Sequence, residues 1–246
     1  MLVSIIIPTL NEAGVLAETL ARLAALRPAP EILVADGGSS DGTPALAAAA
    51  GARLVRCARR GRAFQMNEGA RAAAGDVLLF LHADLELPQA AWNALFETLA
   101  AGELVGGAFR RFFRSRSRLL RWGAQLATLR GHLWGLYFGD QAIFARRAVF
   151  ERLHGFPEIL LFEDLEFSRA LRKAGRTVLI REPIFASSRR FEREGPARRL
   201  WANFVLTGRY LLGQDSERLA RLYYPESFTR RYQKSDQPGP VPKSGG

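Results

Sequence analysis

The sequence contains a single cysteine, Cys57, in 246 residues. One cysteine excludes an internal disulfide and a zinc site built from several thiolates, so we expect this thiol to pack in the interior. Long apolar runs are also absent, since no stretch reaches the roughly 20 apolar residues that span a bilayer. The N-terminus, MLVSIIIPTL, lacks the basic start and the cleavage site of a signal peptide. These absences predict a cytoplasmic protein.

Acidic residues are the minority charge, with 24 Asp and Glu against 35 Lys and Arg and a net charge of +11. Such an excess favours partners that carry phosphate, namely nucleotides, nucleic acid or an anionic membrane. A general bias toward arginine would produce the same excess, so charge alone does not choose among them. No nucleic-acid-binding module is recognisable, and we expect no nucleic-acid partner.

Strand and helix patterns alternate through the first hundred residues. Apolar runs with β-branched residues predict strands at residues 4–8, 31–36, 52–57 and 76–84, each followed by a helical pattern. Four such units with short connections predict an α/β fold with a doubly wound, mostly parallel sheet. Further along, we expect a strand at 106–113, helical regions at 119–138, 163–175 and 198–213, and shorter elements between them.

Polar residues follow each predicted strand, and the carboxyl ends of parallel strands meet at the edge where ligands bind. The Asp36 carboxylate can accept the N–H of a uracil or guanine ring. Arg62, at a predicted helix start, suits a diphosphate. Asp84 is a hard oxygen ligand that could hold a divalent cation against phosphate oxygens. Each motif alone is weak, and DGGSSDG alone could be an ordinary turn, but all four sets share one edge. These sets are 8–12, 36–42, 59–62 and 82–84.

The ordered motifs PTLNE, VADGGSSDGT and HAD resemble those of the family 2 glycosyltransferases, which have the GT-A fold. Three later motifs agree, namely GDQAIF at 139–144, FEDLEFSRAL at 162–171 and SSRRF at 187–191. The resemblance covers about residues 2–191 and is greatest to a small stand-alone bacterial branch without membrane helices. It implies a GT-A type, Rossmann-like sheet with a C-terminal helical elaboration.

The resemblance implies one glycosyltransferase domain at 1–230, with a nucleotide-sugar-binding half at 1–105 and an acceptor half with C-terminal helices at 106–230. Residues 231–246 are rich in Pro, Gly and Ser, and we expect a disordered tail there.

Site residues also follow from the resemblance. It assigns Asp164 as the catalytic base and Asp84 as the ligand of a Mn²⁺ or Mg²⁺ cofactor. Acidic residues also favour the first turn of a helix, which would explain Glu163 and Asp164 without catalysis. The implied nucleotide-sugar contacts are Pro8, Thr9, Glu12, Asp36, Gly61, Arg62, Gln65, Asn67, His82, Ala83, Asp84, Arg189 and Arg190. The implied acceptor contacts are Gly139, Asp140, Gln141 and Glu163.

We therefore expect an inverting, metal-dependent hexosyltransferase that moves a sugar from a nucleotide-diphosphate sugar, with UDP favoured, to an acceptor hydroxyl. His82 stands where the family usually has the first Asp of its metal motif. SSRRF stands where processive members have Gln-x-x-Arg-Trp, which favours addition of one sugar per encounter. Two alternatives remain open: a sugar-1-phosphate nucleotidyltransferase, whose Gly-rich phosphate loop is missing here, and a non-catalytic nucleotide-sugar-binding protein.

Arginine and aromatic residues are interleaved in FRRFFRSRSRLLRW at 109–122. Together with WANFVLTGRYLLG at 201–213, this stretch could contact an anionic membrane that carries a lipid-linked acceptor, which would place the protein at the inner face of the membrane. The alternative is a solvated arginine face whose apolar residues lie in the core.

Overall fold

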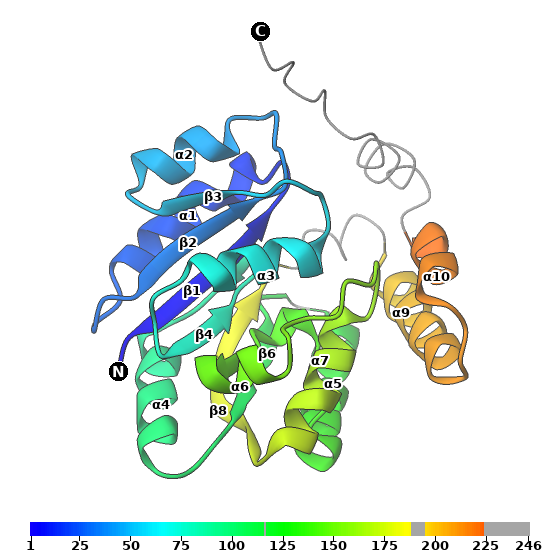
Figure 1. Ribbon diagram of the computed structural model, residues 1–246. Coiled ribbons are helices and arrows are strands. Elements are labelled where there is room, and N and C mark those ends of the chain that lie inside the picture. The colour runs from blue at the N-terminus through cyan, green and yellow to red at the C-terminus, as the bar shows by residue number, and fades with distance from the viewer. Residues whose placement is uncertain (116, 188–194, 224–246) are drawn as a thin grey trace, which may run out of the picture.

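The computed structural model describes residues 1–115, 117–187 and 195–223, in which an eight-stranded sheet has helices on both faces (Figure 1). The strands are β1 (Val3–Thr9), β2 (Glu31–Asp36), β3 (Arg53–Arg56), β4 (Val77–Phe80), β5 (Leu85–Glu86), β6 (Gly106–Phe113), β7 (Phe144–Arg146) and β8 (Thr177–Ala186). The helices are α1 (Ala13–Ala24), α2 (Thr43–Ala49), α3 (Arg62–Ala72), α4 (Gln89–Ala100), α5 (Arg118–Trp134), the 3₁₀ helix η1 (Gly139–Gln141), α6 (Arg147–Arg152), α7 (Glu163–Ala174), α9 (Pro196–Leu211) and α10 (Ser216–Tyr223).

The strands lie in the order β3-β2-β1-β4-β7-β6-β8-β5. β1 is parallel to both β2 and β4, and β2 is parallel to β3, which confirms the parallel sheet predicted for the first four strands. Strand β7 runs antiparallel between β4 and β6, whereas β6 and β8 pair in parallel. The predicted mostly parallel α/β fold is therefore confirmed, with β7 and the short β5 as the antiparallel members.

Side chains of the central strands alternate between two cores because strand periodicity is two. Ile5 and Ile7 of β1 point into one core with α1, α4 and α5, and Ile6 points into the other with α3, α6 and α7. The second core is rich in aromatic rings, and the Phe156 ring lies 4.7 Å from that of Phe80 and 4.3 Å from that of Phe167. Phe156 belongs to the loop between α6 and α7, so this packing anchors that loop in the second core.

Several predicted boundaries were wrong. The helical region expected at 119–138 ends at Trp134, because Gly135 takes a left-handed conformation with φ +58°. The predicted strand at 76–84 ends at Phe80, because the chain turns at 83–84 to begin β5, which pairs with β8. Helix α3 ends at Ala72, three residues before the expected Gly75, because Ala73 is already extended with φ −71° and ψ 153°. Gly75 instead lies against β1, where its N–H donates to Ser4 Oγ at 2.8 Å.

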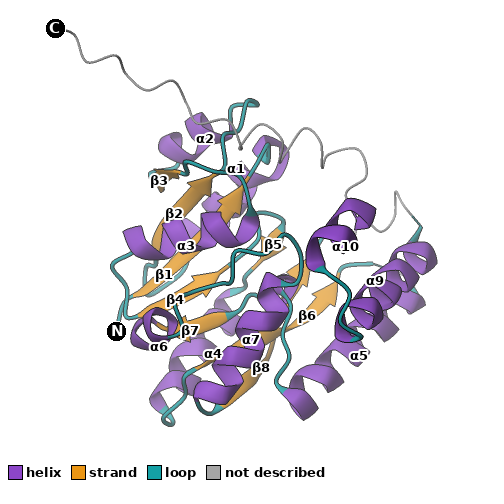
Figure 2. Ribbon diagram, turned by 45° about the vertical axis from the view of Figure 1, so that its right-hand side comes forward, coloured by secondary structure: helices purple, strands orange, loops and turns teal. Residues whose placement is uncertain are grey.

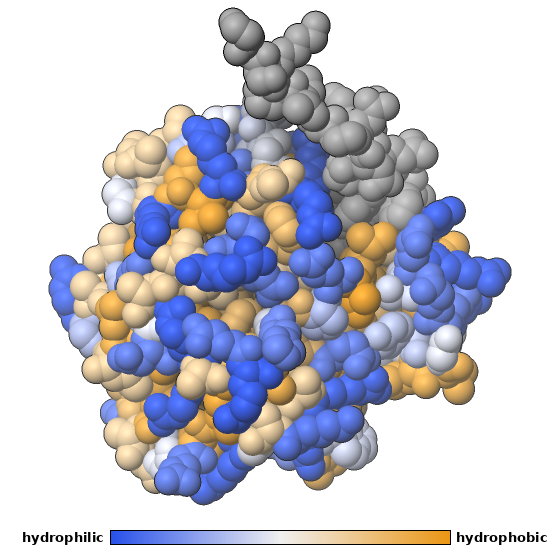
Figure 3. Space-filling model, viewed as in Figure 1, coloured by the Kyte–Doolittle hydropathy of each residue, from blue (hydrophilic) through white to orange (hydrophobic). Residues whose placement is uncertain are grey.

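The predicted C-terminal helical elaboration is present as α9 and α10, which lie beside α5 and α7 (Figures 1 and 2). A third apolar cluster joins them to the start of α7 through Leu161, Phe162, Leu165, Leu206, Leu219 and Ala220. Apolar side chains also reach the surface over α9 (Figure 3). Within the described ranges, no helix is long and apolar enough to cross a membrane. The tail at 231–246 lies outside these ranges.

Candidate active site

Asp36 ends β2, and the following loop curls around its carboxylate. Oδ2 accepts hydrogen bonds from the backbone N–H groups of Gly38 and Ser39, each at 3.0 Å. Oδ1 accepts from Thr9 Oγ1 at 3.3 Å and from the Ser39 hydroxyl. Asp36 is only 3% exposed, and its hydrogen bonds join the end of β1, the end of β2 and this loop into one edge.

Two buried amides of α3 hold backbone segments around this edge. Gln65 Nε2 donates to Thr9 O at 2.6 Å and to Ala35 O at 2.9 Å, which joins the ends of β1 and β2. Asn67 donates to Phe156 O and accepts from Phe156 N, both at 2.9 Å. These bonds give Gln65 and Asn67 a clear positioning role, and their predicted nucleotide contacts stay predictions.

Asp164 lies in the first turn of α7, which begins at the predicted residue and ends one residue before the predicted end. Its Oδ2 accepts from Gly139 N at 2.6 Å and its Oδ1 accepts from Leu165 N at 2.7 Å. Phe162, the residue just before the helix, has a φ of +70°, a left-handed conformation that is strained for a bulky side chain. The helix start is therefore held in one geometry that fixes both carboxylate oxygens.

Gly139 allows the end of β4 to approach the start of α7. A Cβ atom at this position would lie 2.6 Å from His82 Nε2 and 3.4 Å from Asp164 Oδ2. Burial and the nearby Arg62 guanidinium lower the pKa of His82 to about 3. The imidazole is therefore neutral at neutral pH, and it can act there as a hydrogen-bonding group rather than a cation.

Glu163 is 1% exposed, and its Oε1 lies 3.0 Å from Arg62 Nε. That contact is an ion pair without hydrogen-bond alignment, since neither carboxyl oxygen of Glu163 has a hydrogen-bond partner among the described residues. The pKa of Glu163 is raised to about 7, mainly because burial disfavours the carboxylate; the Arg62 guanidinium opposes this rise, and the nearby Asp164 carboxylate adds to it. A carboxyl group that exchanges its proton near neutral pH thus lies next to the predicted catalytic base.

A small cavity of about 10 Å³ connects these groups, with room for about one water molecule. Its lining includes the polar side chains of Arg62, His82, Glu163 and Asp164, together with Pro8 and Gly139. Five regions that are separate in the sequence and were assigned to the site therefore meet here. Asp84 lies beyond the cavity, exposed to solvent, whereas Ala83 packs in the core at 4% exposure.

Two arginines that sequence reasoning did not assign hold η1. Arg111 of β6 is paired with Asp140, and Arg130 of α5 donates to Gln141 Oε1 at 2.8 Å. Burial lowers the pKa of Arg111 to about 9 and that of Arg130 to about 10, so both stay protonated at neutral pH. The expectation of a solvated arginine face fails for Arg111, which is 8% exposed. Its spacing of two residues from Phe109 and from Phe113, which places all three on one face of the strand, was the available signal.

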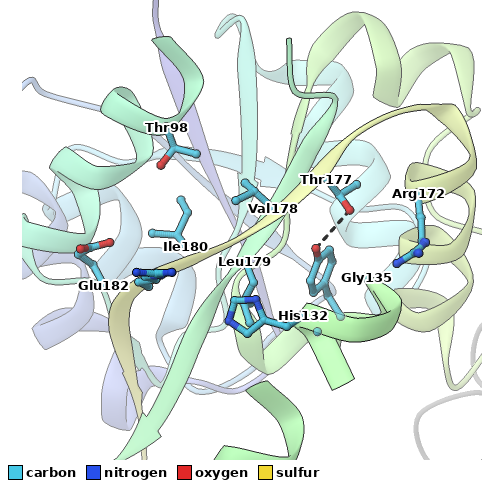
Figure 4. A pocket seen from close by; sticks show the side chains of 12 residues that line it. Thr98, His132, Gly135, Arg172, Thr177, Val178, Leu179, Ile180 and Glu182 are labelled. Carbon is cyan, nitrogen blue, oxygen red and sulfur yellow. Dashed lines mark hydrogen bonds between the residues drawn. The ribbon is translucent and has the colours of Figure 1, made fainter. Parts of the chain in front are cut away.

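The remaining predicted residues lie at the same edge or outside the described ranges. Gly61, with a φ of +142°, precedes α3, and Glu12 precedes α1 with its N–H bonded to Thr43 Oγ1 at 3.0 Å. Arg189 and Arg190 fall in 188–194, which the structure does not describe. A larger hollow of about 430 Å³ lies over the start of β8 and contains none of the predicted residues (Figure 4).

Comparison with known protein families identifies the family of the chain. The family described as Glycosyl transferase family 2 matches residues 4–154, more than half of the chain. The chain belongs to glycosyl transferase family 2. The family match includes Asp36, His82 and Asp84 but ends before Asp164.

Among curated proteins, this family 2 chain is similar to the undecaprenyl-phosphate 4-deoxy-4-formamido-L-arabinose transferase of Aeromonas hydrophila subsp. hydrophila. The two are 33% identical over 162 residues, which is 59% of this chain and 48% of that transferase. The chain thus spans about half the length of the curated relative it matches.

Solved structures share the fold of this family 2 chain. Glucosyl-3-phosphoglycerate synthase from Mycobacterium tuberculosis, in complex with Mn²⁺, UDP and glucosyl-3-phosphoglycerate, aligns with a TM-score of 0.54 and 23% identity over 83% of this chain and 78% of that one. S. aureus TarS 1–349 in complex with UDP-GlcNAc aligns with a TM-score of 0.59 and 18% identity over 76% of this chain and 58% of that one. At these identities the likeness establishes the GT-A type fold that the sequence predicted.

Proposed function

We propose that the protein is an inverting glycosyltransferase that moves a hexosyl group from a UDP-sugar to an acceptor hydroxyl in the cytoplasm. The observation that carries the proposal is Asp164, held by Gly139 N and Leu165 N at the edge of the sheet where β1, β2 and β4 end. Open α/β sheets bind ligands at this edge. The two similar structures described above, which contain UDP or UDP-GlcNAc, support the choice of nucleotide.

The nucleotide would bind along the ends of β1 and β2, near Pro8, Thr9, Glu12 and Asp36. Arg62 would meet the diphosphate, because its side chain is one-third exposed and it begins a helix whose free N–H groups favour an anion. Gly61, Gln65 and Asn67 would shape this side of the pocket. In the same proposal, Arg189 and Arg190 complete the donor site from the part of the chain that is not described.

A divalent cation would bind at Asp84. The described residues contain no group of three or more His, Cys, Asp or Glu side chains that could hold a metal by themselves. One exposed carboxylate fits Mg²⁺ or Mn²⁺ only together with diphosphate oxygens, which is how these ions commonly bind nucleotides. When bound, the cation would offset negative charge on the diphosphate. Similar structures contain Mn²⁺ or Mg²⁺ with UDP.

Asp164 would act as the general base, accepting the proton of the acceptor hydroxyl as that oxygen attacks the anomeric carbon. Gly139 N and Leu165 N each occupy one lone pair of a different carboxylate oxygen, so the group keeps its orientation while lone pairs remain for the acceptor. Attack opposite the leaving diphosphate inverts the anomeric centre. Neutral His82, which like Asp164 lies next to Gly139, would contact the donor.

The acceptor would lie against η1, where Gly139, Asp140 and Gln141 meet Glu163. Arg111 and Arg130 hold that helix through their contacts with Asp140 and Gln141, so side-chain contacts position the acceptor side as they do the donor side. The name of the Aeromonas relative contains a lipid-linked phosphate, and a lipid-linked acceptor is therefore our working choice.

Calorimetric titration of UDP and GDP, each with and without Mn²⁺, tests the donor site. We expect UDP to bind in a Mn²⁺-dependent manner, and Asp84→Ala to weaken binding at least about tenfold. Asp164→Asn should retain UDP affinity and lose sugar transfer by about a thousandfold or more, because only the base is removed. Equal loss of binding and transfer in Asp164→Asn would contradict its role.

The same assays separate the two alternative functions. A sugar-1-phosphate nucleotidyltransferase would release pyrophosphate from UTP and a sugar phosphate, and this product is expected to be absent. A non-catalytic binding protein would bind UDP yet turn over no donor with any acceptor, including membrane extracts that supply lipid-linked sugars.

A further inference from the structure

Helix α5 is apolar on two opposite faces. The face toward β6 buries Leu120, Ala124, Ala127 and Gly131. The residue two positions after each of these is also apolar and is exposed, namely Trp122 (65%), Leu126 (61%), Leu129 (52%) and Leu133 (54%). Two residues correspond to about 200° around an α-helix, so this second stripe points directly away from the sheet. Packing of the domain explains the first stripe and leaves the second without a function.

Helix α9 extends the exposed apolar surface. It lies beside α5, where Leu200 packs over Gly123, and the two helices run side by side in Figure 2. The rings of Trp201 (67% exposed) and Phe204 (70% exposed) stack with centroids 5.8 Å apart. Leu211 and Leu212 continue this surface at the end of the helix. We call the exposed apolar residues of α5 and α9 the outer face.

The two helices that carry the outer face have charged side chains of one sign only. Neither Arg118–Trp134 nor Pro196–Leu211 contains an aspartate or a glutamate. Arg118, Arg121, Arg198 and Arg209 are all exposed, and no carboxylate in the described ranges pairs with any of them. A second copy of the chain docked on this surface would place arginines against arginines, which is unfavourable. The surface is complementary to something apolar that also carries negative charge.

We propose that the outer face docks on an anionic lipid bilayer, with α5 and α9 lying in the plane of the interface. Helices that bind this way combine a stripe of Trp, Phe and Leu with flanking basic residues and low overall hydrophobicity. Trp122 and Trp201 would sit at headgroup depth, and the arginines would contact lipid phosphates. This docking surface is inferred from the exposure and the charge of its residues, independently of the proposed function.

Docking would also bring the membrane to the acceptor side of the site, an inference that rests on the proposed function. Arg130 projects from the flank of α5, about 70° around the helix axis from the exposed stripe, and there it donates to Gln141 Oε1 at 2.8 Å and to Leu136 O at 3.1 Å. The same helix would therefore contact lipid through the exposed stripe and hold η1 through its flank. A lipid-linked acceptor could reach Asp164 without leaving the bilayer.

Co-sedimentation of the full chain with vesicles tests the docking surface. We expect partition into phosphatidylcholine vesicles that contain phosphatidylglycerol to be about tenfold or more stronger than into phosphatidylcholine alone, and to weaken at high salt. Trp122→Ser with Leu126→Ser should reduce partition about tenfold or more. Arg118→Glu with Arg121→Glu should do the same and should also remove the preference for phosphatidylglycerol.

Matched controls change the same residue types elsewhere. Leu2→Ser alters an apolar side chain that is 40% exposed, and Arg152→Glu alters an exposed arginine of α6 on the other face of the sheet. Both should bind vesicles like the unchanged protein. The docking proposal is overturned if the unchanged protein ignores anionic vesicles or if the outer-face variants bind as tightly as the controls.

Two further measurements separate competing causes. Light scattering would reveal a dimer that is lost in Trp122→Ser with Leu126→Ser; such a dimer without vesicle binding would make the outer face a self-association surface and overturn the proposal. UDP titration on the same preparations tests the active site independently. Vesicle binding that depends on the outer face, without UDP binding, would uphold this surface and contradict the proposed function.

Discussion

The buried carboxyl group of Glu163 should make the stability of the protein fall as the pH rises. Its pKa is about 7 in the folded protein against an ordinary value of 4.5. Between these values the folded protein keeps a proton that the unfolded chain has released. This contribution is fully present below pH 4.5 and is lost as the pH rises through about 7. The slope is about −1.4 kcal/mol per pH unit, and the whole contribution is about 3 kcal/mol.

Glu163→Gln isolates this effect, because the amide has the shape of the carboxyl group and does not ionise. We expect the free energy of unfolding of the variant, relative to that of the unchanged protein, to rise by about 3 kcal/mol as the pH increases from about 4.5 to about 8. Arg62 loses its ionic partner in the variant, but its side chain is 32% exposed and solvent offsets much of that loss. The measurement is urea denaturation at several pH values, with a check that the slope m is unchanged.

Glu18→Gln is the matched control, because the Glu18 side chain is 62% exposed and pairs only with Arg22 on its own helix among the described residues. It should follow the unchanged protein within about 0.5 kcal/mol at every pH. If the stability of Glu163→Gln runs parallel to that of the unchanged protein across this range, burial does not disfavour the Glu163 carboxylate. The reasoning is then refuted, and Arg62 fully compensates the buried charge.

Three shorter predictions concern packing around the site. Gly139→Ala should lower the free energy of unfolding by about 1–3 kcal/mol through a clash with His82, and His82→Ala should restore most of it in the double variant, as urea denaturation would show. Asn67→Ala should cost about 2–4 kcal/mol in the same assay, because two buried backbone groups of Phe156 lose their partners; a cost below 1 kcal/mol would contradict this. Burial raises the pKa of Cys57 to about 12, so iodoacetamide at about pH 8 should label the folded protein far more slowly than the urea-unfolded chain; equal rates would contradict this pKa.

The geometry of the proposed donor side was predictable because it is local. Asp36 ends an apolar strand and is followed by glycines, so sequence alone placed it at the carboxyl edge next to Pro8 and Thr9. The edge itself follows from the parallel pairing of strands that alternate with helices. The acid pair of α7 was also predicted to lie at the start of a helix, and α7 begins at Glu163 as expected.

The acceptor side was less predictable because its geometry depends on contacts between distant segments. The Arg111–Asp140 pair joins residues 29 apart, and Gly139 N meets Asp164 across 25 residues. Arginines in a basic stretch resemble a solvated face, and only the alternation of β6 indicates that Arg111 points inward. Strand β5 has two residues and forms only because β8 is there to pair with it, so no local pattern marks it.

The third apolar cluster gives the start of α7 a separate unit of cooperativity. Leu206, Leu219 and Ala220 cover Phe162, whose ring stacks on that of Tyr210 at 4.4 Å, and no strand residue takes part. Apart from Leu200, α9 and α10 therefore share little apolar contact with the sheet. Amide protons of these two helices should exchange with deuterium before those of β1 and β4. Each such opening would uncover the strained Phe162, which precedes Glu163 and Asp164. The two carboxylates therefore keep their positions only while α9 and α10 are folded, although neither helix contributes an assigned residue to the site.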